Sequence, residues 1–136
     1  DKGLSLAEAE AVLSGKSGLL GVSGISSDMR DLAASDSLAA QEAIDLFCYR
    51  AARQIGSMAA ALEGLDAIVF TAGIGENAAN IRADILERVR WLGVELDRDA
   101  NLSTGPRIST PDSKTSAWVL ATDEERVICE QTVALL

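Results

Sequence analysis

Histidine is absent from this 136-residue sequence, and basic side chains are scarce. Without histidine, the chain has no His-based acid–base catalysis and no His metal ligand of its own. There are 12 Lys and Arg against 21 Asp and Glu, a net charge of −9, and no run of basic residues, so we expect neither a nucleic-acid surface nor an anionic-membrane surface. A phosphate ligand would need backbone donors, an arginine or a metal ion, because the net charge would repel it.

Long apolar runs are also missing. None approaches the length of a membrane span, and the charged first residues form no signal-peptide pattern. Cys48 and Cys129 each lie in an apolar helical pattern, which predicts two buried, reduced thiols and an intracellular location. The chain begins at Asp1 rather than at methionine, so we expect a piece of a longer protein. A hydrophobic content of 48% predicts a globular domain with a core.

The strongest pattern is a buried strand, a glycine turn and a helix in immediate succession. The strand is the apolar, β-branched run 65–70. Gly73 and Gly75 follow, and positions without a Cβ let the backbone come close to a ligand. Asn77 is placed to cap the helix and Gly93 to end it. Charged residues separate its apolar positions, which are Ile81, Ile85, Val89 and Leu92.

A turn of this kind points backbone N–H groups and the positive end of a helix at one spot, which favours an anion. Considered alone, two glycines can also serve only to tighten the turn. Gly73, Gly75 and Ala78 further fit the dinucleotide pattern G-x-G-x-x-A, with Glu95 and Asp97 near the position of an acidic ribose ligand. The residues alone leave both kinds of ligand open.

Two regions precede this unit. Ser5 and Glu8 predict a capping box for a first helix, and the Ser- and Gly-rich segment 14–27, with interleaved aliphatic residues, predicts a packed, irregular stretch. The longest periodic pattern covers 36–62 and predicts a helix with Asp36 as its N-cap. Its apolar stripe fits an internal core better than a subunit interface.

Downstream of the central unit, short strands are predicted at 94–97, 107–109 and 116–121, with a loop at 98–106. Thr122 and Glu125 predict a capping box for a last helix. The order of elements is typical of a single α/β domain.

Three stretches together resemble the C-terminal part of the acetate kinase family. In chain order they read SGISSDMR at 23–30, DAIVFTAGIGEN at 66–77 and TDEE at 122–125. The similarity extends over nearly the whole chain, including 92–97. It implies the α/β fold of the acetate and sugar kinase, Hsp70 and actin superfamily, an actin-like, ribonuclease H-like ATPase fold with a central sheet flanked by helices. Residues 1–136 would form the C-terminal nucleotide-binding domain.

The resemblance implies reversible transfer of a phosphoryl group from ATP to acetate, giving acetyl phosphate and ADP, with Mg²⁺. The residues that it assigns to the nucleotide are Asp28, Met29, Arg30, Gly73, Ile74, Gly75, Glu76 and Asn77. It assigns Mg²⁺ to Glu124, and one carboxylate suits a cation that keeps waters and phosphate oxygens as ligands. From the residues alone, Arg30 can instead pair with Asp28 or Asp31, and Glu124 can simply complement a helix N-terminus.

The chain departs from the family in two ways. Members more often have two glycines where this chain has Ala72 and Gly73, and we expect the extra methyl group to be tolerated while narrowing the turn. Members are also much longer, and their acetate pocket and transition-state arginine and histidine lie upstream. We therefore expect the N-terminal domain to be absent, no catalytic residue in this segment, and no turnover by the segment alone.

The resemblance further implies ATP or ADP as partner, acetate and acetyl phosphate through the missing domain, a homodimer, and a cytoplasmic location. Three alternatives remain: a propionate or other short-chain acyl kinase of the same family, a non-catalytic dimerisation module, and a dinucleotide-binding oxidoreductase. The last fits poorly, because a long segment precedes the glycine turn and the strand after the helix is short.

Overall fold

The computed structural model describes residues 3–103 and 105–135, except for the side chain of Glu124. The chain divides into two compact units, Asp1–Ile55 and Gly56–Leu136. No helix in the described part of the chain has the length and apolarity needed to cross a membrane.

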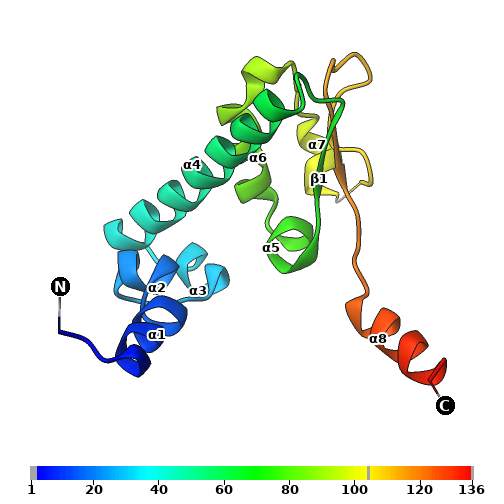
Figure 1. The fold of residues 1–136 in the computed structure, drawn as a ribbon. Helices are drawn as coiled ribbons and strands as arrows, with labels where there is room; N and C mark the ends of the chain where they lie inside the picture. The colour runs from blue at the N-terminus through cyan, green and yellow to red at the C-terminus, as the bar shows by residue number, and fades with distance from the viewer. Residues whose placement is uncertain (1–2, 104, 136) are drawn as a thin grey trace. The chain divides into compact units, whose positions relative to one another are not determined.

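The first unit is helical. Its elements are α1 (Leu6–Gly15), α2 (Gly18–Ser23), α3 (Met29–Ala33) and the first part of α4 (Leu38–Ala61) (Figure 1). The Ser5–Glu8 capping box is confirmed, since the Ser5 hydroxyl accepts from the Glu8 N–H and the Glu8 carboxylate accepts from the Ser5 N–H. The irregular structure predicted for 14–27 is wrong over α2, where local backbone hydrogen bonds close a short helix along α4.

The long helix predicted over 36–62 is confirmed as α4, with its first helical residue at Leu38. Its buried face and the short helices make the core of the first unit, which contains Met29, Leu32, Ala40, Ala43, Ile44 and Cys48. The prediction of a buried thiol is therefore confirmed for Cys48.

The second unit is mixed α/β. Its elements are β1 (Ala67–Phe70), α5 (Ala72–Asn77), α6 (Ala79–Arg88), the 3₁₀ turn η1 (Arg90–Leu92), α7 (Arg98–Leu102), β2 (Ser116–Val119) and α8 (Glu124–Val133). Within the described residues, β1 and β2 form a two-stranded parallel sheet in which Ile68 faces Ala117 in register. The strands predicted at 65–70 and 116–121 are therefore confirmed. The sheet packs on a core of Ile81, Ile85, Leu86, Val89, Val94 and Ile108.

The segment after β1 differs from the predicted glycine turn. The chain enters α5 directly, and both glycines lie inside this short helix. Asn77 does not cap the next helix: Ala78 precedes α6, and the Asn77 side-chain amide donates to the Gly73 carbonyl one turn earlier, at 2.9 Å. Gly93 does end the α6–η1 segment, with a left-handed φ of 85° that favours glycine.

The short strands predicted at 94–97 and 107–109 are wrong. Each region contributes an isolated antiparallel bridge, such as the one between Leu96 and Ser109. An isolated bridge pairs only one residue on each side, so neither region forms a strand.

The loop predicted at 98–106 is wrong at its beginning, where α7 forms. Asp97 caps this helix, because its carboxylate accepts from the Ala100 N–H at 3.0 Å. The capping signal was present in the sequence as an acidic residue before a short polar segment.

The start of the last helix also differs from the prediction. Asp123, rather than Thr122, caps α8 and accepts from the Arg126 N–H at 2.9 Å. Cys129 is exposed, which contradicts the predicted burial. The described side chains of α8 are all exposed, including Val127 and Ile128. A helical apolar stripe predicts burial only where a second element covers it.

Candidate functional site

The glycine helix α5 lies at the carboxyl end of the parallel strand β1. Thr71 is its N-cap residue, in an extended conformation, so the chain passes from Phe70 into the first helical turn with a single connecting residue (Figure 1). In open α/β sheets, ligands bind outside the carboxyl ends of the strands. The predicted nucleotide segment therefore occupies the edge of the sheet at which a ligand is expected.

Gly73 and Gly75 differ in what their missing side chains permit. A Cβ at Gly75 would lie 3.1 Å from the carbonyl carbon of Phe70, so any larger residue would require α5 or the end of β1 to move by a few tenths of an ångström. A Cβ at Gly73 would meet no atom within 4 Å. Gly75 thus packs closely against the end of β1, whereas Gly73 leaves open space beside the first turn of α5.

Ala72 adopts a conformation that favours glycine. Its φ is +57°, in the left-handed region, where a Cβ costs roughly 1–2 kcal/mol. The methyl group expected to be tolerated here is accommodated, but in an unfavourable backbone conformation. A glycine at position 72 would avoid this cost.

Arg82 holds α5 in place through hydrogen bonds to its backbone, a role that was not predicted from the sequence. The side chain is 1% exposed. Its Nη1 donates to the Gly75 and Glu76 carbonyls at 2.9 and 2.8 Å, while its Nε and Nη2 donate to the side-chain and backbone oxygens of Asn101 at 2.8 and 2.6 Å. Burial lowers the pKa of Arg82. The guanidinium thus joins the last carbonyls of α5 to α6 and α7.

A signal for this role was available in the helical pattern. Arg82 precedes Leu86 by four residues, and residues at that spacing share one face of a helix. Both side chains are buried. In the sequence, Arg82 is one of the charged residues between the apolar positions of the predicted helix, and no role was predicted for it.

Glu76 connects α5 to the segment before α8. Its Oε1 accepts from the backbone N–H and the hydroxyl of Thr122, at 3.1 and 3.2 Å. The structure therefore brings the predicted nucleotide segment close to the TDEE motif. The side chain of Glu124, the predicted Mg²⁺ ligand, lies outside the described residues.

The other predicted nucleotide residues, Asp28, Met29 and Arg30, belong to the first unit. Asp28 caps α3 through the Arg30 N–H and also accepts from the Arg30 Nε, at 2.8 and 3.1 Å. The Arg30 side chain, together with its backbone N–H, lowers the pKa of Asp28 to about 2, and Asp28 raises the pKa of Arg30. The ion pair that the residues alone allowed is present, yet the Arg30 side chain is 90% exposed and accessible to a ligand.

Met29 contrasts with its two neighbours, because its side chain is 5% exposed and lies in the core of the first unit. Any contact of Met29 with a nucleotide would therefore come from its backbone.

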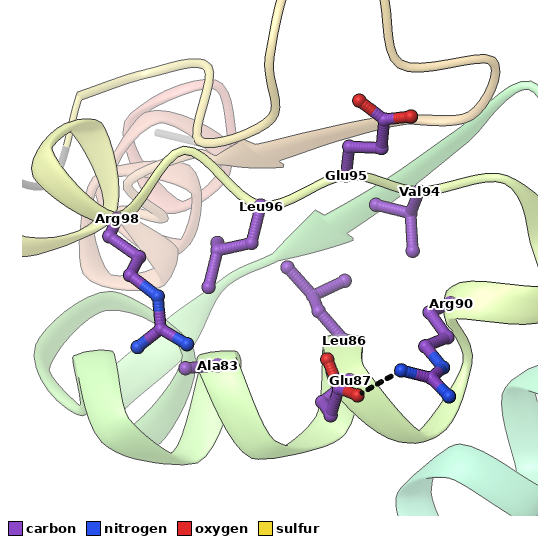
Figure 2. Close-up of a pocket in the computed structure, with 8 residues that line it drawn as sticks. All are labelled: Ala83, Leu86, Glu87, Arg90, Val94, Glu95, Leu96 and Arg98. Carbon is purple, nitrogen blue, oxygen red and sulfur yellow. Dashed lines mark hydrogen bonds and ion pairs between the residues drawn. The ribbon is translucent and has the colours of Figure 1, made fainter.

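A separate cavity of about 530 Å³ lies between α6 and the segment that follows η1 (Figure 2). Its lining residues are Ala83, Leu86, Glu87, Arg90, Val94, Glu95, Leu96 and Arg98. None of the predicted nucleotide residues lines it. Figure 2 shows Arg98 extending toward Ala83 and Glu87 paired with Arg90, at 2.9 Å. The local charges are thus partly compensated within the cavity.

The two acidic residues considered for a dinucleotide ribose have other contacts. Asp97 caps α7, and Glu95 accepts from the Thr110 hydroxyl at 3.2 Å and lines the cavity of Figure 2. Both carboxylates thus have partners outside the glycine helix α5. This arrangement disfavours the dinucleotide interpretation.

The described residues contain no group of three or more His, Cys, Asp or Glu side chains that could hold a metal ion. Mg²⁺ does not require such a group, because it is commonly held by one or two carboxylates together with substrate phosphates and water.

Comparisons with known proteins agree on one family. The chain matches the acetokinase family over residues 1–130. It is 59% identical over 130 residues to an acetate kinase of Rhodopseudomonas palustris, a match that covers 94% of this chain and 33% of that protein. The chain thus spans about a third of the length of the curated relatives that it matches.

Two solved structures have the same fold. The acetate kinase of Porphyromonas gingivalis is 35% identical with a TM-score of 0.87, over 98% of this chain and 35% of that one. A propionate kinase of Francisella tularensis is 39% identical with a TM-score of 0.85, over 95% of this chain and 34% of that one. These likenesses confirm the fold class that the three sequence stretches implied.

Proposed function

Because the chain belongs to the acetokinase family, we propose that residues 1–136 are the C-terminal nucleotide-binding domain of an acetate kinase. The complete enzyme would transfer a phosphoryl group reversibly between ATP and acetate, giving ADP and acetyl phosphate. The observation that carries the proposal is the glycine helix at the carboxyl end of β1, where Gly73 leaves open space beside the first turn of α5.

The nucleotide would contact two groups of residues. Around α5, the backbone of Gly73–Asn77 would lie close to the nucleotide and its phosphates, because Gly73 presents no Cβ. Arg30 would offer its exposed, planar guanidinium to a base or a phosphate, with Asp28 orienting it. The net charge of −9 makes such local donors necessary.

Mg²⁺ would be held by Glu124, together with phosphate oxygens and water. The neighbouring Asp123 caps α8, because its Oδ1 accepts from the Arg126 N–H, and the family resemblance supports Glu124 as the carboxylate of the TDEE motif for the metal. A bound Mg²⁺ would neutralise charge on the phosphates during transfer.

A propionate kinase is the second candidate, supported by the likeness to the Francisella tularensis enzyme. Acyl preference would depend on the part of the protein outside this chain. A homodimer and a cytoplasmic location belong to the same proposal and are supported by the family resemblance alone. Whether the acyl substrate is acetate or propionate, we propose that the segment by itself does not catalyse phosphoryl transfer.

Calorimetric titration with Mg·ADP tests the nucleotide site, with Gly73→Ala as the variant. Since the new methyl group would meet no protein atom within 4 Å, the fold should be retained while the space for the ligand is reduced. We expect saturable binding by the unchanged chain and an increase in Kd of about tenfold or more in the variant.

Gly15→Ala is the matched control, because a Cβ at Gly15 also meets nothing within 4 Å and the residue lies in α1. It should bind as the unchanged chain does. Equal affinity for all three proteins would show that the nucleotide does not approach α5 at Gly73. Gly75→Ala is unsuitable, since it would disturb the contact with Phe70 whether or not a ligand binds.

A further inference from the structure

We propose that the carboxylate of Glu76 is a positioning group: it fixes the segment before α8 against the end of α5 and contacts neither nucleotide nor metal. This inference rests on the proposed function, because α5 and the start of α8 are the segments to which the nucleotide and Mg²⁺ are assigned. In this proposal the side chain of Glu76 and its backbone have different roles. The side chain holds Thr122, and the backbone remains free to approach the ligand.

The contact joins residues that are 46 positions apart in the sequence. The segment after β2 is attached to the sheet through the Leu120 N–H, which donates to the Phe70 carbonyl at 3.0 Å. Two residues later, the N–H and the hydroxyl of Thr122 both donate to the Glu76 Oε1, at 3.1 and 3.2 Å. Asp123 then begins α8 as its cap. Glu76 therefore holds the segment between the sheet and the last helix at Thr122, which is two residues before Glu124.

Glu76 can hold this segment in place because its own backbone is fixed. Its carbonyl accepts from the buried Arg82 at 2.8 Å, and the preceding carbonyl of Gly75 accepts from the same nitrogen at 2.9 Å. Arg82 is in turn bound to Asn101 of α7. A continuous set of hydrogen bonds thus runs from α7 through Arg82 and Glu76 to Thr122.

Electrostatics also disfavours Glu76 as a direct ligand of phosphate. A carboxylate close to nucleotide phosphates would repel them, whereas a carboxylate that accepts two hydrogen bonds has its charge partly compensated. The role that fits both the charge and the geometry is attachment of Thr122, which sets the position of the TDEE motif relative to α5.

Hydrogen exchange at the Thr122 amide tests the contact in this chain without any ligand. Glu76→Ala removes the acceptor, and we expect exchange to become about threefold to tenfold faster, the equivalent of one lost hydrogen bond. Glu76→Gln keeps a side-chain oxygen that can accept from both Thr122 donors, so its exchange should stay close to that of the unchanged chain. Equal exchange in all three proteins would overturn the contact.

The Mg²⁺ dependence of ADP binding, followed by calorimetry, tests the positioning role. Glu76→Ala should require about threefold to tenfold more Mg²⁺ for half-maximal ADP binding, while Glu76→Gln should need nearly the same concentration as the unchanged chain. A loss in Glu76→Gln as large as in Glu76→Ala would overturn the proposal, because it would show that the negative charge itself contacts the metal.

Thr122→Val supplies an independent variant that keeps the size of the side chain and removes its hydroxyl. It should shift the Mg²⁺ dependence in the same direction as Glu76→Ala, and the double variant should be no worse than Glu76→Ala alone. Additive effects would overturn the coupling. Failure of the unchanged chain to bind ADP would count against the proposed function only, since the exchange experiment does not involve nucleotide.

Discussion

Asp28 and Arg30 stabilise each other's charge on the surface of the first unit. The side-chain and backbone hydrogen bonds of Arg30 lower the pKa of Asp28 from 3.8 to about 2. The pKa of Asp28 is lower in the folded chain than in the unfolded chain, so the ion pair stabilises the folded chain at pH values above the unfolded pKa. This stabilisation is lost as the pH falls through about 2.

We predict that an NMR titration of the Asp28 carboxyl carbon will give a midpoint of about 2 in the unchanged chain. In Arg30→Gln the midpoint should rise toward the ordinary value, because the charged donor is lost. An Asp28 midpoint that does not respond to the substitution would contradict the ion pair.

The two glycines of α5 show what the sequence could and could not predict for single residues. The pattern identified Gly73 and Gly75 as a pair, and both lie where a ligand is expected. Only the structure separates them, because the close contact of Gly75 comes from Phe70 of the preceding strand, and the left-handed φ of Ala72 comes from the geometry of the connection. A spacing motif carries no information about such contacts.

The position of α5 as an element depends on Arg82. Replacing Arg82 with Met would leave the carbonyls of Gly75, Glu76 and Asn101 without this donor. Because buried unsatisfied groups are costly, we predict a loss of about 3 kcal/mol in the free energy of unfolding. Urea denaturation followed by circular dichroism would measure it.

Arg98→Met is the matched control for this substitution, since Arg98 is an exposed arginine at the start of α7. Its unfolding free energy should change by no more than about 0.5 kcal/mol. Arg82→Lys should remain destabilised, because an ammonium cannot reproduce the planar fork that reaches α5 and α7 together. Similar losses in Arg82→Met and Arg98→Met would contradict the anchoring role.

The long helix α4 and the two strands were predictable from the sequence, whereas the shortest helices were not. The helix α4 repeats its apolar positions over many turns, and β1 and β2 are compact apolar runs, so the pattern itself defined them. The helices α2, α5 and α7 have only five or six residues each. At that length, caps such as Asp97 and tertiary hydrogen bonds such as those of Arg82 decide the conformation, and periodicity has too few turns to be read.

At the scale of the whole molecule, the sequence was informative about the family and uninformative about what covers its surfaces. Composition and three motifs were enough to predict the fold class and the family, which the comparisons bear out. The exposure of Cys129 and of the apolar side chains of α8 was missed, because a helical stripe indicates that a face is apolar without indicating which element packs on it.

Turnover is the property that we expect this chain to lack when it is isolated. Phosphoryl transfer depends on positive charge placed around the transferring group. Here Arg82 is buried and bound to carbonyls, and Arg30 is paired with Asp28. The chain also spans only about a third of its curated relatives. We therefore predict that the chain mixed with Mg·ATP and acetate forms no acetyl phosphate above background, although Mg·ADP still binds.

Trapping of acetyl phosphate with hydroxylamine provides the measurement, with a complete acetate kinase as the positive control. Binding without turnover would place the groups that act on the transferring phosphoryl in the part of the protein outside this chain. Formation of acetyl phosphate that is lost in Gly73→Ala would contradict the prediction, because it would show that residues of this segment suffice for transfer. The Gly73→Ala comparison is essential, since the added methyl group meets open space and therefore reports on the nucleotide rather than on folding.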